Sequence, residues 1–141
     1  MSTQQNPTKY AECIQYQLAQ IVDPIPVYAN FSRNWAKEGS GFLTWQLRNV
    51  HQPVYTGQTQ SNKGIDRPTF QISVFAANMD AAFNLSNEIL HSLHGYSGTF
   101  GNPATSGFFV AKADVTWLFN TYDDTLKMNQ IILDCTLDIP T

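Results

Sequence analysis

Charged side chains are scarce in this sequence. Of its 141 residues, eight are Lys or Arg and eleven are Asp or Glu, together 13%, against about 25% in an average globular domain. The net charge of −3 argues against a protein that holds nucleic acid mainly through phosphate contacts. A low charge content is typical of proteins covered by neighbours, because the centres of interfaces are depleted of charge and enriched in aromatic residues.

Long apolar runs and cysteine motifs are also missing. No apolar stretch approaches the ~18 residues that span a bilayer, so we expect no membrane association. The first residues hold neither a basic nor an apolar region, so we expect no secretory signal and synthesis in the cytoplasm. Cys13 and Cys135 lie too far apart for a metal or redox motif. Both fall on apolar stripes, which predicts buried small hydrophobic residues.

Two segments have the 3–4-residue periodicity of amphipathic helices. The first begins at Pro7, where a missing N–H costs nothing, and ends at Asp23, because the residue before a proline leaves the helical region. The second runs over 79–93, with Asn78 as its N-cap and Gly95 placed just after its end.

Strand patterns occupy much of the remainder. The expected strands are 42–50 with a hairpin partner at 54–59, then 68–76, and finally 108–119 and 127–139 joined by a turn within 120–125. Residues 57–67 and 95–107 read as loops. These elements predict one domain over residues 1–141 with an α+β fold: a mostly antiparallel sheet, two helices packed on one face, and a long C-terminal β-hairpin.

Chemical motifs are weak, and each has a structural explanation. His91 and His94 lack the further ligands of a zinc site and suit a helix C-terminus. Asp123-Asp124 fits a turn, and the glycines at 95, 98 and 101 follow a helix rather than precede one, as a phosphate loop requires. Cys13 lies on an apolar stripe and should be inert. We therefore expect no catalytic residues, no metal, no cofactor and no enzymatic activity.

Two segments are candidates for contacts with other chains. Trp35 lies between Arg33 and Lys37, a composition typical of interface hot spots. The polar 57–67 loop, which holds Lys63 and Arg67, is long for a compact domain and could become ordered on contact with a neighbour. We expect Trp35→Ala or deletion of this loop to break an assembly while leaving the fold intact. The other two tryptophans are predicted to pack in the core or on the sheet: Trp45 and Trp117.

The order of these features resembles the tail terminator, or tail completion, proteins of long-tailed phages, which include small minor tail proteins. A helix leads into the Ile-Pro-Val-Tyr segment at 25–28. The strand at 67–76 then runs straight into the helix at 79–93. A hairpin carrying Asp123-Asp124 and ending in Leu-Asp-Cys-Thr-Leu-Asp-Ile at 133–139 follows.

The resemblance implies a virion protein of the tail or neck. Such a protein forms a ring, expected to be a homohexamer, on the last ring of tail tube protein and stops tube growth. Its other face docks to the head–tail connector, and DNA passes through the bore without specific binding. Isologous contacts cannot build such a stack, so subunits must join head-to-tail around the ring axis. The edge of the long terminal hairpin is a candidate place for subunits to pair by strand addition.

Three alternatives remain open at this stage. Another neck component, such as a head completion or stopper protein, would bind portal-proximal rings instead of tube protein. A small monomeric, immunity-type binding module would not assemble. An enzyme of unrecognised type would need a deep polar pocket that the sequence does not indicate.

Overall fold

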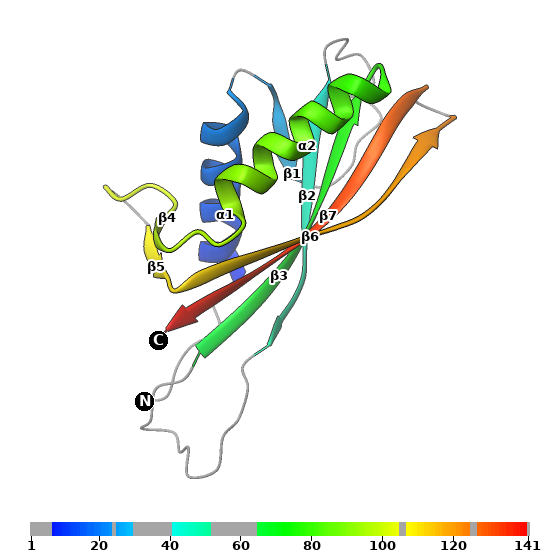
Figure 1. The fold of residues 1–141 in the computed structure, drawn as a ribbon. Coiled ribbons are helices and arrows are strands. Elements are labelled where there is room, and N and C mark those ends of the chain that lie inside the picture. Colours follow the sequence, from blue (N-terminus) through cyan, green and yellow to red (C-terminus); the bar gives the residue numbers. More distant parts are fainter. Residues whose placement is uncertain are drawn as a thin grey trace.

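The computed structural model describes residues 7–23, 25–29, 41–51, 65–104, 107–124 and 127–140. Two helices and seven strands follow one another along the chain (Figure 1). Their bounds are α1 (Pro7–Val22), β1 (Val27–Ala29), β2 (Phe42–His51), β3 (Ile65–Ala76), α2 (Met79–Leu93), β4 (Gly98–Phe100), β5 (Phe108–Val110), β6 (Lys112–Asp123) and β7 (Met128–Pro140).

A five-stranded sheet in the order β1-β2-β3-β7-β6 forms the centre of the structure. Three of its four strand pairs are antiparallel, and the short β1 pairs with β2 in parallel. A separate two-stranded sheet joins β4 to β5. The predicted α+β fold, with its mostly antiparallel sheet and long C-terminal hairpin, is therefore confirmed.

Both helices cover the same face of the sheet (Figure 1), as predicted. The core lies beneath them, and alternate residues of the central strands supply it. Trp45, Ile72 and Leu133 lie side by side in register on β2, β3 and β7, and the last two are fully buried. On the same face, the Trp45 Nε1 donates to Gln15 Oε1 of α1 at 2.6 Å. Cys13 and Cys135 are also fully buried and unbridged, as predicted.

The ends of α2 follow the predicted chemistry. The Asn78 side chain accepts a hydrogen bond from the Ala81 N–H at 2.8 Å, which satisfies one of the orphan donors of the first turn. After the helix, Gly95 takes a φ of +80°, a left-handed conformation that glycine adopts without a Cβ clash. The sequence therefore determines both ends of this helix locally.

The expected start of the middle strand was wrong, because β3 begins at Ile65 rather than at 68. The last part of the predicted 57–67 loop, including Arg67, is thus strand. Pro68 lies inside a central strand, where proline is rare because it has no N–H to donate. It faces Val50 of β2, whereas the pairing with β7 skips Arg67 and Pro68 and resumes at Thr69. The sheet accommodates the missing donor by leaving this gap.

The segment predicted as one strand over 108–119 is two strands with a bend at Ala111. The first part pairs with β4, which lies inside the expected 95–107 loop, and the second pairs with β7. At the bend the Ala111 N–H donates to the Asp138 carbonyl at 2.8 Å, so its backbone donor stays satisfied. The reversal into β7 also comes later than expected, because strand pairing continues to Asp123 opposite Met128.

The predicted hairpin partner at 54–59 lies outside the described residues, as does most of the irregular 29–41 segment. Trp45 is buried, with 8% of its surface exposed, which confirms its predicted place. Trp117 packs on the sheet edge but remains 37% exposed. No helix in the described ranges is long and apolar enough to cross a membrane.

Candidate functional site

The outer side of β6 carries four of the six exposed large hydrophobic side chains among the described residues. β6 is an edge of the five-stranded sheet, and all seven residues from Thr116 to Tyr122 are exposed. We call this segment the β6 edge. Its large hydrophobic side chains are 37–53% exposed: Trp117, Leu118, Phe119 and Tyr122. An edge strand presents unpaired N–H and C=O groups, so this segment can accept another strand.

Charge does not protect this edge. The eight residues from Val115 to Tyr122 carry no charged side chain, and Asp114 and Asp123 flank them. Natural edge strands that stay monomeric usually carry lysine, proline or an inward-pointing charge. An uncharged aromatic edge is instead typical of the centre of a protein interface.

A register shift between Trp117 and Phe119 determines which face of the sheet each of these side chains lies on. Before the shift, Val115 lies opposite Cys135 and points into the core; after it, Phe119 lies opposite Ile132 on the other face. A bulge of this kind increases the local twist of a strand. The far end of the β6–β7 hairpin extends away from α1 in Figure 1. Aromatic side chains therefore project on both faces of the β6 edge.

Trp117 is held in place by the second helix. Its ring stacks on Phe83 of α2, with 6.1 Å between centroids and 11° between planes. The C-terminal end of α2 is fixed to β6 as well, because the Val115 N–H donates to His94 Nδ1 at 3.0 Å. The start of the β6 edge is thus anchored to the core through α2.

The opposite edge of the sheet has a different shape. There, an apolar groove of about 440 Å³ runs between α1 and β1. Ala11 and Gln15 line it from the helix, and Val27 and Ala29 line it from β1. We call it the α1–β1 groove. One sheet edge therefore projects aromatic side chains and the other offers an apolar hollow.

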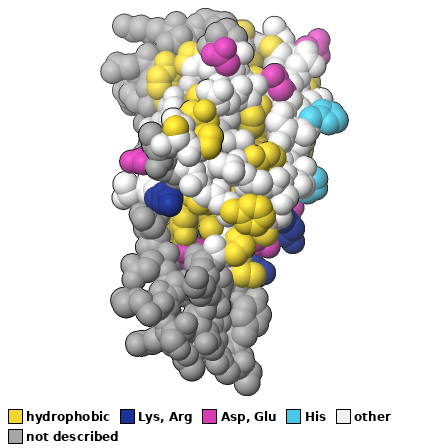
Figure 2. All heavy atoms as spheres, turned by 90° about the vertical axis from the view of Figure 1, so that its left-hand side faces the viewer, with side chains coloured by type: hydrophobic (Ala, Val, Ile, Leu, Met, Phe, Trp, Pro, Cys, Tyr) yellow, Lys and Arg dark blue, Asp and Glu magenta, His cyan; other side chains and the backbone are white. Residues whose placement is uncertain are grey.

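A smaller exposed aromatic surface lies at the β4–β5 hairpin. Phe109 is 55% exposed, whereas the neighbouring Phe108 packs its ring edge against Tyr10, with 5.3 Å between centroids. Lys9 Nζ lies 5.7 Å from the Phe108 ring centroid. Figure 2, which views the side of the molecule where Figure 1 shows α1, β4 and β5, shows hydrophobic side chains gathered in several patches.

Of the five residues predicted to contact other chains, only Arg67 lies in the described part of the structure. Its Nε donates to Asp138 Oδ1 at 3.1 Å, across from β3 to β7 on the sheet face opposite the helices. The structure therefore gives Arg67 an intramolecular partner, and its role at an interface stays a prediction. The other four residues lie outside the described ranges: Arg33, Trp35, Lys37 and Lys63.

The sequence predicted that subunits pair by strand addition at the edge of the long terminal hairpin, but it did not single out residues 116–122 or show which strand is outermost. It recognised the strand by its Phe, Val and Trp content, but alternation cannot tell which strand of a sheet is outermost. The available signal was the uncharged run from Val115 to Tyr122, bounded by Asp114 and Asp123.

The weak metal candidates have structural roles in the described chain. His94 accepts the Val115 N–H, and its Nδ1 lies 3.7 Å from Asp114 Oδ1. His91 is exposed in the last turn of α2. Within the described ranges, no group of three or more His, Cys, Asp or Glu side chains is placed to hold a metal ion.

Comparison with known proteins finds a likeness in fold to a solved structure. No family model matches the chain, and no curated protein sequence matches it. A chain in the solved structure of the virion of a native gene transfer agent particle shares the fold, with a TM-score of 0.61. The two chains are 15% identical, and the match covers 93% of each. At this identity the likeness establishes a common fold over nearly the whole chain.

Proposed function

We propose that this protein is a non-enzymatic structural subunit of a phage-like virion. The observation that carries the proposal is the fold shared with a gene transfer agent virion chain over 93% of both chains. The exposed, uncharged β6 edge supports the proposal independently, because such a surface suits a protein that assembles.

Within the virion, we propose the role of a tail terminator. In this role the subunits form a ring, six copies in the simplest case, that caps the last layer of the tail tube and accepts the head–tail connector. The order of elements that resembles tail terminators is present in the structure, including the direct passage from β3 into α2 and the long β6–β7 hairpin. DNA would pass through the bore without sequence-specific contacts.

The two unlike sheet edges favour a head-to-tail contact. A ring needs two different surfaces on each subunit, because a contact between identical patches closes at a dimer. We propose that the β6 edge of one copy packs its aromatic side chains against the α1–β1 groove of the next. Both surfaces are largely apolar, and they lie at opposite ends of the sheet order β1-β2-β3-β7-β6.

The first test is the mass of the purified protein by light scattering across a range of concentrations, with negative-stain images of the same samples. Rings of about six subunits are expected. A concentration-independent monomer, combined with failure to bind isolated tail tubes, would refute the terminator role. Binding to portal-proximal rings but not to tubes would instead identify a head-side neck protein and leave the virion proposal standing.

A further inference from the structure

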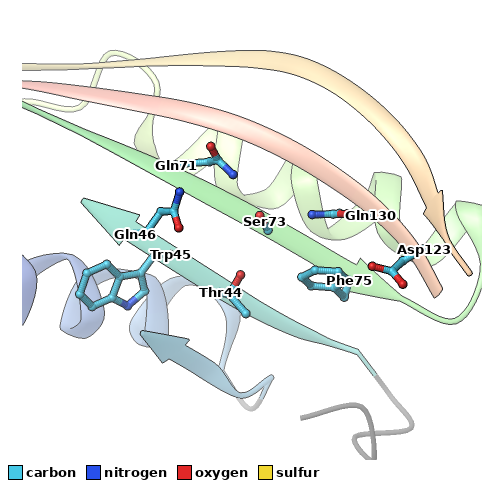
Figure 3. A pocket seen from close by; sticks show the side chains of 8 residues that line it. All are labelled: Thr44, Trp45, Gln46, Gln71, Ser73, Phe75, Asp123 and Gln130. Atoms are coloured by element: carbon cyan, nitrogen blue, oxygen red, sulfur yellow. The ribbon is translucent and has the colours of Figure 1, made fainter. Parts of the chain in front are cut away.

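Two polar features of the described residues do not belong to the proposed ring contact. One is a pocket of about 240 Å³ on the sheet face opposite the helices, where Thr44 of β2 faces Ser73 of β3 (Figure 3). The amides and hydroxyls that line it both donate and accept hydrogen bonds, so they select no particular ligand. The other is His94 at the C-cap of α2, where one ring nitrogen has two competing partners.

The residues that follow α2 cover the outer side of β6 at its start. The Ala113 N–H donates to the Tyr96 carbonyl at 3.0 Å, and the Gly95 N–H donates to the Ala113 carbonyl at 2.8 Å. The next outward N–H along β6 is that of Val115, because outward-facing backbone groups alternate along a strand. It donates to a side-chain acceptor, His94 Nδ1, at 3.0 Å. A side chain therefore completes the cover that the backbone begins.

This hydrogen bond fixes the protonation state of the His94 ring. A backbone N–H can only donate, so Nδ1 must carry a lone pair, and the ring is neutral with its proton on Nε2. The same Nδ1 lies 3.7 Å from Asp114 Oδ1. An ionised carboxylate can only accept, so Nδ1 can bond to it only after taking up a proton. The two contacts of Nδ1 therefore exclude each other.

We propose that His94 is a pH-sensitive switch at the junction of α2 and β6. When the ring takes up a proton from solvent, Nδ1 stops accepting from Val115 and donates to Asp114 instead. Histidine changes its charge between about pH 5 and 8, so the bond to Val115 is present at the upper end of this range and is lost as the pH falls. Val115 is only 5% exposed, so its released N–H needs water or another strand as a partner. Acidification thus adds a backbone donor to the open side of β6.

The surroundings of His94 accommodate the protonated ring. The His94 and Asp114 side chains are each 57% exposed, so a proton reaches the ring from solvent. The C-terminal end of α2 is the negative end of the helix dipole, which stabilises a cation there. The nearby Lys112 Nζ lies 3.8 Å from Asp138 Oδ2 of β7. The other titratable neighbours are exposed, paired or buried: His91 one turn earlier on α2, Asp134 in an ion pair with Arg48, and Cys135 opposite Val115.

Hydrogen exchange of single amides tests the switch in the full-length protein, measured by mass spectrometry with electron-transfer fragmentation over a series from pH 7.5 to pH 5. Each rate is divided into that of an unfolded chain at the same pH, which gives a protection factor. We expect the protection of Val115 to fall about five- to tenfold over the series, the effect of one lost hydrogen bond. The Ala113 amide is the internal control, since its acceptor is a backbone carbonyl, and its protection should not change. The measurement needs no ring, so a failure of ring formation does not affect it.

Variants assign the change to His94. In His94→Asn the side chain can still accept from Val115 but cannot be protonated, so the protection of Val115 should become independent of pH. His91→Asn is the matched control and should keep the pH response. Asp114→Asn removes the carboxylate that holds the protonated ring and should move the loss of protection to lower pH. Thermal melting of each variant checks the fold.

Four results would each overturn the proposal. The first is equal protection of Val115 in the wild type at pH 7.5 and pH 5. The second is a pH response that persists in His94→Asn, and the third is one that disappears in His91→Asn. The fourth is an unchanged midpoint in Asp114→Asn, because the proton would then not exchange one partner of Nδ1 for the other.

Discussion

The Tyr10 hydroxyl donates a hydrogen bond to Asp66 Oδ2 at 2.5 Å, joining α1 to the first part of β3 inside the core. Tyr10 is 4% exposed and Asp66 is fully buried. This contact links the N-terminal helix to the strand segment that the sequence alone placed in a loop. It also puts a carboxyl group beneath the helices, where an unpaired one would be strongly unfavourable.

We expect Tyr10→Phe to lower the free energy of unfolding by about 1–3 kcal/mol, because a buried carboxyl group loses a donor while the ring packing stays intact. Tyr16→Phe on the same helix is the matched control, since the Tyr16 hydroxyl makes no hydrogen bond within the described part of the chain. Urea unfolding of the three proteins measures the difference. Equal stability of all three would mean that the Tyr10 contact contributes nothing.

Alkaline pH should weaken the fold through two buried acids. Burial, with the hydrogen bond to Asp66, raises the pKa of Tyr10 above its usual 10.0. Burial, with the nearby carboxylates of Asp114 and Asp134, raises the pKa of Cys135 from 9.0 to about 12. The folded state holds both protons more tightly than the unfolded chain does. Their stabilising contribution is therefore complete below pH 9 and is lost as the pH rises toward 12 and beyond.

Denaturation curves at pH 8, 9.5 and 11 check this pH dependence. Tyr10→Phe should show a shallower loss of stability above pH 10 than the wild type, because one of the two titrating groups is gone. The native Cys135 thiol should also resist alkylation at pH 8 and react once the protein is unfolded. Rapid labelling of the native protein at both cysteines would contradict the burial of these thiols.

The two hydroxyl pairs on the face opposite the helices should respond in opposite directions to removal of a hydroxyl. Thr44→Val removes a buried hydroxyl that faces Ser73 across β2 and β3 and has no hydrogen-bond partner among the described residues. We expect this change to raise stability by about 1 kcal/mol. Thr69→Val breaks the hydrogen bond with Thr136 and is expected to lower it by about 0.5–1 kcal/mol. Valine has nearly the shape of threonine and suits a strand, so the hydroxyl is the main difference. Melting temperatures of the two variants measure the contrast.

Alanine substitutions at two glycines with positive φ distinguish the cost of backbone strain from the cost of steric crowding. At Gly95, φ +80°, an added methyl group would meet no atom within 4 Å, so Gly95→Ala should cost about 1–2 kcal/mol from backbone strain alone. At Gly101, φ +92°, the methyl group would lie 2.5 Å from Cys13 Sγ on α1. Gly101→Ala adds overpacking of about 1–3 kcal/mol to the same strain. If the two variants have the same melting temperature, α1 does not pack as closely on the β4–β5 region as described.

A charge at the β6 edge should block assembly without unfolding the subunit. Phe119 is 48% exposed, so Phe119→Lys should change the stability of the subunit by less than about 1 kcal/mol. The buried lysine it would place in a subunit contact should dissociate rings into monomers. Asn87→Lys on the exposed side of α2 is the control and should leave rings intact. Sedimentation velocity distinguishes the outcomes, and a Phe119→Lys variant that still forms rings would exclude this edge as the contact.

The local features of the chain could be predicted from the sequence, and the long-range ones could not. Both helices follow from apolar periodicity and caps such as Asn78. The start of β3 was missed because Pro68 looks like a strand boundary when its neighbours are unknown. The bend at Ala111 was missed because it depends on which partners, β4 and β7, lie beside each half. Pairing between segments far apart in sequence decides both features.

The candidate sites follow the same division. Exposure of Phe119 depends on β6 being outermost, and the pocket depends on Thr44 and Ser73 meeting across two strands. The local sequence pattern predicts neither property. Of the residues proposed from sequence for contacts, Arg67 is placed by the structure in an ion pair, while the segments around Trp35 and Lys63 lie outside the described ranges.

An unprotected sheet edge has consequences before the subunit assembles. Each newly made chain displays seven consecutive exposed, uncharged residues on an outer strand, and that strand can pair with any exposed strand, correct or incorrect. In the proposed ring the next copy of the same chain covers this edge, so incorrect pairing is open only to subunits that have not yet assembled. Variants that assemble slowly should therefore aggregate more than the wild type does.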